Sequence, residues 1–196
     1  MTARTHNWLW LDLETTCLDP HSPGALVLEV AAVFAADDTA GDLSPVHEFT
    51  TAIRWEPHEL EAAWSALPKR DASYVRNMHT VNGLLPDVAN APARLPDVED
   101  YLCMWVREIC GTEQVRGLRL AGNSIGGFDL QWIRIHMPKF AALLSHQVLD
   151  VTSLRAFVQA FHPDKVRYVD QKAHRALADV RESLATAAWV RQVCGI

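Results

Sequence analysis

The chain has 196 residues, of which 49% are hydrophobic and 21% are charged, and its formal net charge is −6. This length and composition suffice for one hydrophobic core and exclude a disordered chain, so we expect a single domain over residues 1–196. The negative charge argues against wrapping long nucleic acid by broad phosphate neutralisation, although a small anionic substrate can still be held through metal ions.

The sequence favours a cytoplasmic location. It has no uninterrupted apolar run of about 18 residues, the length that a transmembrane helix needs, and its start, MTARTHNW, carries no apolar segment of a secretory signal. The four cysteines lack CxxC and zinc-ligand spacing, which favours reduced thiols with a structural role: Cys17, Cys103, Cys110 and Cys194.

The first half of the chain predicts a three-strand meander followed by helices. Apolar runs at residues 8–14, 25–36 and 45–53 predict the strands. From about residue 57 to residue 110 the pattern becomes helical, with one helix ending before Asn82 and Gly83 and another over residues 95–110. We expect the stretch from Pro86 to Pro96 to be a flexible connection.

The second half predicts alternating strands and helices. Residues 118–123 and 146–151 indicate strands, residues 128–136 a helix, and residues 176–193 a long amphipathic helix. We interpret Asp150 as the N-cap of another helix. This order of elements predicts an α/β fold, with a mixed sheet flanked by helices.

The sequence LDLE places two carboxylates, Asp12 and Glu14, in the apolar first strand. The strand period of two points both side chains to one face, where a divalent cation that prefers oxygen ligands would offset their repulsion. The alternative is a strand end that emerges into water. Two further acidic pairs with this spacing lie in polar helical sequence and are expected to be solvated: Glu59/Glu61 and Asp97/Glu99.

Three more residues can complete such a site. Asp129 follows the glycine-rich GNSIGGF and starts a predicted helix, where the alternative is a first-turn Asp that stabilises the helix dipole. His174 precedes Asp179 by five residues, and the alternative is a pair on a helix surface. Two metal ions about 4 Å apart would bind a phosphate, and a histidine would accept the proton of the attacking water. The set therefore describes metal-dependent phosphodiester hydrolysis.

The order of these motifs resembles the DEDDh family of 3'-5' exonucleases, which has Asp-x-Glu in the first strand, a central Asp and a late His-x4-Asp. Within that family the sequence is most similar to the oligoribonucleases over nearly its whole length, through LWLDLETTCLDP, MHTVNGLL, AGNSIGG and AHRALADVRESLATAAWVR. The resemblance implies a ribonuclease-H-like fold with three antiparallel strands. It also implies an enzyme that hydrolyses short RNA to nucleoside 5'-monophosphates.

The resemblance further implies roles for individual residues. Four carboxylates would hold two Mg²⁺ or Mn²⁺ ions, and His174 would be the general base in a loop before the last helix. The four are Asp12, Glu14, Asp129 and Asp179.

Four other positions match substrate contacts of that family. Leu18 would wedge between the terminal bases, Tyr74 and His79 would lie near the bases, and Ser124 would contact a phosphate. The alternatives are, in the same order, a turn leucine, a core aromatic, a surface-loop histidine and a helix-cap serine.

Two features depart from the oligoribonuclease pattern. His146 and Gln147 replace a Tyr–Arg pair that reaches across a dimer interface, and Gln147 cannot make the bidentate, charge-assisted contact of arginine with phosphate. The motif that contains Asp129 reads GGFD, where oligoribonucleases have a glutamine and one residue fewer. This form of the motif is closer to that of general DEDDh exonucleases. Dinucleotide preference and the choice between RNA and DNA are therefore open.

Two alternative functions stay open as well. One is a DNA-directed or mixed-specificity exonuclease of the proofreading or trimming type. The other is a catalytically silent nucleic-acid-binding protein on the same fold, although the sequence keeps all four carboxylates and the histidine. The resemblance also implies a homodimer with an interface around residues 139–151.

Overall fold

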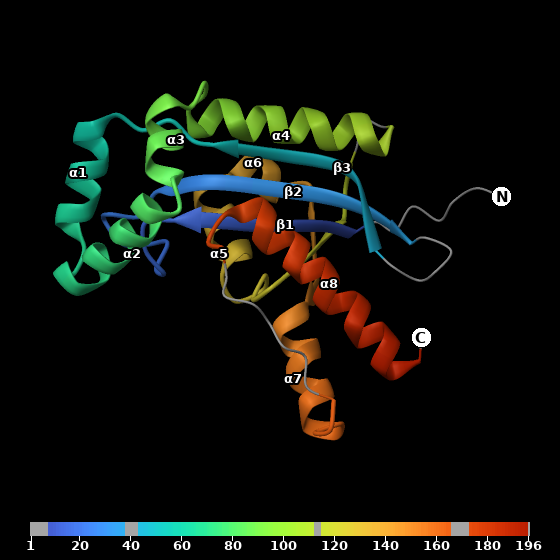
Figure 1. Ribbon diagram of the computed structural model, residues 1–196. Helices are drawn as coiled ribbons and strands as arrows, with labels where there is room; N and C mark the ends of the chain where they lie inside the picture. The colour runs from blue at the N-terminus through green and yellow to red at the C-terminus, as the bar shows by residue number, and fades with distance from the viewer. Residues whose placement is uncertain (1–7, 38–42, 112–114, 166–172, 196) are drawn as a thin grey trace.

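A five-stranded mixed sheet forms the centre of the protein, with strand order β3-β2-β1-β4-β5 (Figure 1). The computed structural model describes residues 8–37, 43–111, 115–165 and 173–195. β1 and β3 run antiparallel to β2, whereas β4 runs parallel to β1 and β5 parallel to β4, as the predicted fold requires. The strands are β1 (Trp8–Thr15), β2 (Val27–Asp37), β3 (Leu43–Ala52), β4 (Leu118–Gly122) and β5 (Leu144–Asp150).

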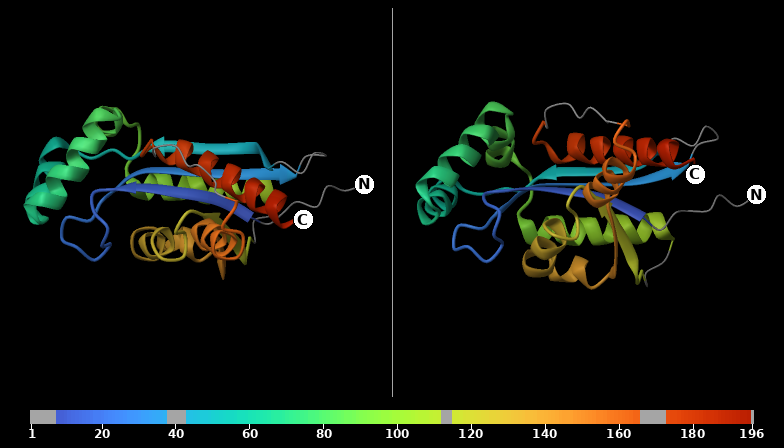
Figure 2. Two further views of the ribbon diagram at one scale, coloured as in Figure 1. Left: turned by 60° about the horizontal axis from the view of Figure 1, so that its bottom comes forward. Right: turned by 90° about the horizontal axis from the view of Figure 1, so that it is seen from below.

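Helices cover both faces of the sheet and one of its ends. Figure 2 shows the helix of residues 176–194 on one face and helices from the middle of the chain on the other. The helices are α1 (Pro57–Ala66), α2 (Lys69–Val81), α3 (Leu84–Asn90), α4 (Leu95–Cys110), α5 (Asp129–His136), α6 (Pro138–Ala141), α7 (Val151–Phe161) and α8 (Ala176–Cys194). In the part of the chain that the structure describes, no helix is both long and apolar enough to cross a membrane.

The two faces of β1 bury different sets of side chains. Leu9, Leu11 and Leu13 enter a large apolar core with α4, α5 and α6. Trp10 points to the opposite face and packs in a smaller core against α8. Because strand side chains alternate, Asp12 and Glu14 share the α8 face with Trp10. The alternation thus directs both carboxylates toward the start of α8.

Pro86–Pro96 is not a flexible connection, contrary to the sequence-based expectation. α3 occupies its first five residues and α4 begins at Leu95, so a link of only four residues separates the two helices. Leu84 and Val88 of α3 are fully buried in a third apolar cluster, against α1, α2 and β2. This packing, which involves partners distant in sequence, fixes a segment whose prolines suggested a loop.

The expectation of a solvated Asp97/Glu99 pair is also wrong for Glu99. Its carboxylate is buried, and Oε1 accepts hydrogen bonds from the backbone N–H groups of Lys139 at 2.6 Å and Phe140 at 3.0 Å. These N–H groups belong to the first turn of α6, where helix donors have no partner within the helix. Glu99 therefore caps a helix from another part of the chain.

Two smaller expectations are confirmed. Asp150 is the N-cap of α7, because its Oδ1 accepts a hydrogen bond from the Ser153 N–H at 3.0 Å. All four cysteines lie in the described ranges and are free thiols, as their spacing predicted.

Candidate active site

A pocket of about 390 Å³ lies at the carboxyl end of β1 and is lined by all but one of the site residues singled out from the sequence, the exception being His79. Its walls come from β1, α2, the turn after β4, the start of α5 and the start of α8. Four carboxylates meet there although they are only 1% to 8% exposed: Asp12, Glu14, Asp129 and Asp179. The alternative interpretations, in which these acids are surface charges, do not fit this burial.

β1 supplies two carboxylates to the pocket. Asp12 lies opposite Ala31 of β2, and Glu14 lies opposite Glu29. The register shifts between Glu14 and Thr15, an irregularity that in strands redirects side chains near the point where pairing ends. Both carboxylates therefore lie in the regular part of the ladder close to its end, beside the first turn of α8.

Asp129 comes from the first turn of α5 and is almost completely buried. Its Oδ1 accepts a hydrogen bond from the backbone N–H of Leu13 at 3.0 Å. This contact joins the start of α5 to the β1 residue between Asp12 and Glu14. Asp129 therefore does more than stabilise a helix dipole, since it is fixed against the strand that carries the other acids.

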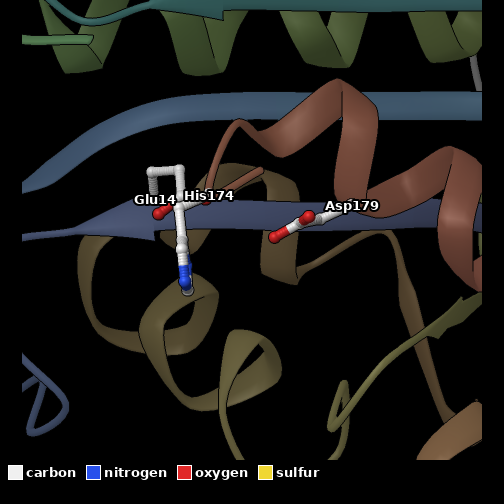
Figure 3. A group of neighbouring side chains, drawn as sticks. All are labelled: Glu14, His174 and Asp179. Atoms are coloured by element: carbon white, nitrogen blue, oxygen red, sulfur yellow. The ribbon is translucent and has the colours of Figure 1, made fainter. Parts of the chain in front are cut away.

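The start of α8 brings His174 and Asp179 to the same place. Donor atoms of Glu14, His174 and Asp179 all lie within 4.8 Å of one another, and Figure 3 shows Asp179 directed from α8 toward the other two. His174 precedes α8 and has a left-handed backbone with φ of 51°. It therefore lies in the connection before the helix rather than on the helix surface.

The donor chemistry of the pocket fits hard divalent cations. All four carboxylates offer oxygen atoms, the ligands that Mg²⁺ and Mn²⁺ prefer. Burying several negative charges in one pocket is unfavourable unless positive charge compensates for it. Cation binding at Asp12, Glu14, Asp129 and Asp179 would supply that charge, and His174 stands beside them at the pocket wall.

Three of the expected substrate contacts line this pocket with accessible side chains. Leu18 is 82% exposed and Tyr74 is 68% exposed, so Tyr74 is not a core aromatic. Ser124 is not the cap of α5, whose N-cap residue is Phe128. The Ser124 hydroxyl lies 3.3 Å from the Thr152 hydroxyl and is exposed at the pocket.

His79 occupies a different position from the one expected. It lies in the last turn of α2 with no exposed surface, so it is not a surface-loop histidine. Its Nε2 lies 3.1 Å from the Thr15 carbonyl oxygen and 3.8 Å from Glu14 Oε2. Direct contact with a base does not fit this position, because other atoms cover the ring. Burial lowers the pKa of His79 and favours the neutral ring, which donates from Nε2 to Thr15.

The pair that departs from the oligoribonuclease pattern lies outside the pocket wall. His146 and Gln147 are exposed on β5, the last strand of the sheet order, and β4 separates β5 from β1. Within this chain the two residues therefore do not approach the carboxylates of β1.

Sequence reasoning missed several polar residues around the pocket. Glu29 is buried in β2 directly opposite Glu14, and it binds Arg175, the residue after His174. Asn123 lines the pocket and is held by Glu182 and Ser183 of α8. A single charge in the apolar run VLEVAAVF was a signal that would have found Glu29. It is the same signal that singled out the acids of LDLE.

Comparison with other proteins shows strong similarity to bacterial proteins named oligoribonuclease, although no family model matches the chain. The protein of Corynebacterium efficiens is 31% identical over 195 residues, which cover 98% of this chain and 80% of that protein. Those of Tropheryma whipplei and Streptomyces avermitilis are each 32% identical over 186 residues, covering 94% of this chain and 91% and 84% of the relatives.

Solved structures with the same fold include exonuclease I. The structure of E. coli exonuclease I in complex with a dA13 oligonucleotide gives a TM-score of 0.60 at 14% identity, and that of Methylocaldum szegediense gives 0.61 at 20% identity. Both comparisons cover 94% of this chain but only 40% of the exonuclease I chain. At these identities the similarity establishes the arrangement of the sheet and helices.

Proposed function

The chain belongs to the oligoribonuclease family and is a 3'-5' exonuclease, and we propose that it hydrolyses short single-stranded RNA to nucleoside 5'-monophosphates. The observation that carries the proposal is the meeting of four buried carboxylates and His174 in one pocket with accessible Leu18 and Tyr74. A single exonuclease domain over residues 1–196 is part of this proposal.

The carboxylates hold two Mg²⁺ or Mn²⁺ ions in the proposed mechanism. When bound, such ions orient the scissile phosphate and stabilise the charge on the attacking and leaving oxygens. Asp12 and Glu14 provide oxygen donors from β1, Asp129 from α5 and Asp179 from α8. Since three separate elements supply the donors, the folded chain fixes their relative positions before substrate arrives.

His174 is the proposed general base. A ring nitrogen accepts a proton from the water that attacks the phosphorus, while the bond from phosphorus to the 3' oxygen of the preceding nucleotide breaks. The terminal nucleotide then leaves with the phosphate on its 5' oxygen. A histidine suits this role because an imidazole ring can accept and release a proton near neutral pH. His174→Gln should lower kcat by about 10²- to 10⁴-fold, the usual contribution of a general base.

Leu18, Tyr74 and Ser124 are the proposed substrate contacts. The exposed Leu18 side chain and Tyr74 ring offer apolar surface to the terminal bases, and stacking on an aromatic ring tolerates any base. The Ser124 hydroxyl lies at the pocket and can donate to a phosphate oxygen. His79 acts indirectly in this proposal, because its ring supports the backbone of Thr15 next to Glu14.

The experiment tests which substrate length the enzyme prefers and whether it prefers RNA or DNA. The purified protein is incubated with Mn²⁺ and a labelled RNA dinucleotide, a seven-residue RNA or a single-stranded DNA of the same sequence, with EDTA and an Asp12→Ala variant as controls. Faster cleavage of the dinucleotide would show an oligoribonuclease despite Gln147. Equal or faster trimming of the longer strands, DNA included, would support a general exonuclease, which the replaced Tyr–Arg pair favours. Absence of cleavage would refute the proposal.

We propose a homodimer with an interface around residues 139–151. β5 is an edge strand, and edge strands present backbone groups that another chain can pair with or cover. Its exposed His146 and Gln147 would then face the partner's pocket. Light scattering after size exclusion gives the mass in solution. A value of one chain, 21.9 kDa, would contradict the proposal.

A further inference from the structure

The backbone of His174 is held in a conformation that side-chain-bearing residues rarely adopt. Its φ of 51° lies in the left-handed region, where the Cβ atom approaches the following carbonyl oxygen. A histidine in this conformation needs surrounding contacts that fix it. The contacts come from the residue after it and from the end of α2.

Arg175 provides the first set of contacts, through a forked ion pair with buried Glu29. Nη2 and Nε donate to Glu29 Oε1 at 2.9 Å and 3.2 Å, and Glu29 Oε2 also accepts the backbone N–H of Ala176 at 2.8 Å. Nη2 further contacts Asp87 Oδ2 of α3 at 2.7 Å. One carboxylate thus binds both the side chain and the main chain immediately after His174.

Asn82 provides the second set, from the C-cap of α2. Its side-chain amide donates to the carbonyl oxygen of His174, and its own carbonyl oxygen accepts from Arg175 Nη1 at 3.4 Å. Asn82 therefore links the left-handed residue itself to the arginine that follows it. Together, these contacts fix the His174 carbonyl and the two residues that follow it.

The register of the sheet connects these contacts to the catalytic pocket. Glu29 of β2 lies directly opposite Glu14 of β1, and like charges in that arrangement repel. The positively charged guanidinium of Arg175 lies next to the Glu29 carboxylate and offsets this repulsion. The Arg175–Glu29 ion pair, which holds the chain after His174, therefore involves the β2 residue that lies opposite Glu14.

We propose that Arg175, Glu29 and Asn82 are positioning residues for catalysis, which hold His174 at its place beside Glu14 and Asp179. The inference rests on the proposed function of His174 as general base. None of the three lines the pocket where the carboxylates meet, so they act through His174 and do not touch the substrate.

The same helix offers a matched control. Arg181 of α8 makes a forked ion pair with Glu48 of β3, with Nη2 at 3.0 Å from both carboxylate oxygens. Like the Arg175–Glu29 pair it joins α8 to the sheet, but its side chains are more exposed, at 57% and 32%, and it lies away from His174. Removal of Arg181 therefore tests loss of a helix–sheet ion pair without loss of the His174 contacts.

The kinetic test compares Arg175→Ala, Arg175→Lys and Arg181→Ala in the full chain, below the lowest melting temperature of the set. We expect Arg175→Ala to lower kcat by about 10- to 100-fold, the range for residues that orient an active-site group, with KM within about twofold. Arg175→Lys should recover part of kcat, because an ammonium can reach Glu29 but cannot form the fork. Arg181→Ala should keep kcat within about twofold of the wild type.

A second readout does not depend on activity. The ring signals of the nine histidines are followed by NMR, and the His174 signal is identified by its loss in His174→Gln. Arg175→Ala should shift or broaden the His174 signal, whereas Arg181→Ala should leave it in place. If Arg175→Ala does not fold, Arg175→Lys and Glu29→Gln take its place in both measurements, with the same directions expected.

The outcomes separate this inference from the proposed function. A wild type that cleaves, together with Arg175 and Glu29 variants that keep its kcat and its His174 signal, would overturn the positioning role. A wild type that cleaves no substrate would refute the proposed function, and a His174 signal that moves only in the Arg175 and Glu29 variants would still support the positioning contacts. Equal losses of kcat in Arg175→Ala and Arg181→Ala would also overturn the inference, since any helix–sheet ion pair would then have the same effect.

Discussion

The two faces of the central sheet use the same strand for different purposes. On the face covered by α4, α5 and α6, β1 contributes only leucines to a large apolar core. On the α8 face it contributes Trp10 and then the carboxylates Asp12 and Glu14. Because side chains alternate along a strand, neighbouring residues of β1 point to opposite faces. One set packs in the apolar core, and the other places carboxylates in the pocket. Substitutions on the two faces should therefore change different measured quantities.

The largest effect is expected on the α8 face, from Asp12→Asn. The substitution removes a charged oxygen donor from the pocket, so kcat should fall on the order of 10³-fold, the upper range for loss of one preorganised electrostatic group. In EDTA the melting temperature should stay the same or rise, because fewer negative charges are buried together. Steady-state kinetics and calorimetry measure the two quantities. A variant that unfolds without losing activity per folded molecule would contradict the separation of the faces.

On the opposite face, Leu102→Ala should affect stability instead. Leu102 of α4 is fully buried in the large core, and truncation of such a leucine costs about 3 kcal/mol of the free energy of unfolding. Urea unfolding measures this loss, and kcat of the folded variant should stay within about twofold of the wild type. Leu177→Ala in the half-buried margin of the α8-side core is the matched leucine control, with a smaller expected cost. A kcat of folded Leu102→Ala that falls by clearly more than twofold would contradict the separation of the two faces.

Glu99 is the polar exception on the apolar face, and Glu99→Ala sharpens the comparison. The substitution leaves the N–H groups of Lys139 and Phe140 without their acceptor, at a cost of about 2 kcal/mol in the free energy of unfolding. Glu99→Gln keeps an acceptor oxygen and should recover part of this loss. Hydrogen exchange at Phe140 gives a local measurement, and it should accelerate in the alanine variant. Unchanged exchange would show that the cap is not needed for α6.

The smallest effect concerns the thiol of Cys103 beside Glu99. Burial, and secondarily the charge of Glu99, raises the pKa of Cys103 to about 11. Between the unfolded pKa near 9 and this value the unfolded chain loses its proton first, so stability should fall as pH rises through that window. Cys103→Ala should remove this part of the alkaline decline. Iodoacetamide at pH 8 should modify the exposed Cys194 and leave Cys103 intact, and rapid labelling of Cys103 would contradict its burial.

The sequence predicts well those features that depend on local pattern. The apolar run at residues 8–14 predicts the first strand, the strand period of two predicts the shared face of Asp12 and Glu14, and Asp150 is predicted as a cap from its own turn. Features set by distant contacts are not predictable in this way. α3 is held by the burial of its apolar side chains and by the Arg175–Asp87 ion pair. Glu99 is buried where its carboxylate accepts hydrogen bonds from the first turn of α6. The Arg175–Glu29 pair joins residues 146 positions apart, which no local pattern reveals.

The return of α8 to β1 has a consequence for the order of synthesis. Asp12 and Glu14 leave the ribosome long before His174 and Asp179, and all four meet in one pocket. A nascent chain that ends before residue 173 contains three of the four carboxylates and lacks His174, the proposed general base. Ribosome-bound fragments that end before residue 173 should therefore be inactive, and hydrolysis should begin only after α8 has been made and has docked on the sheet.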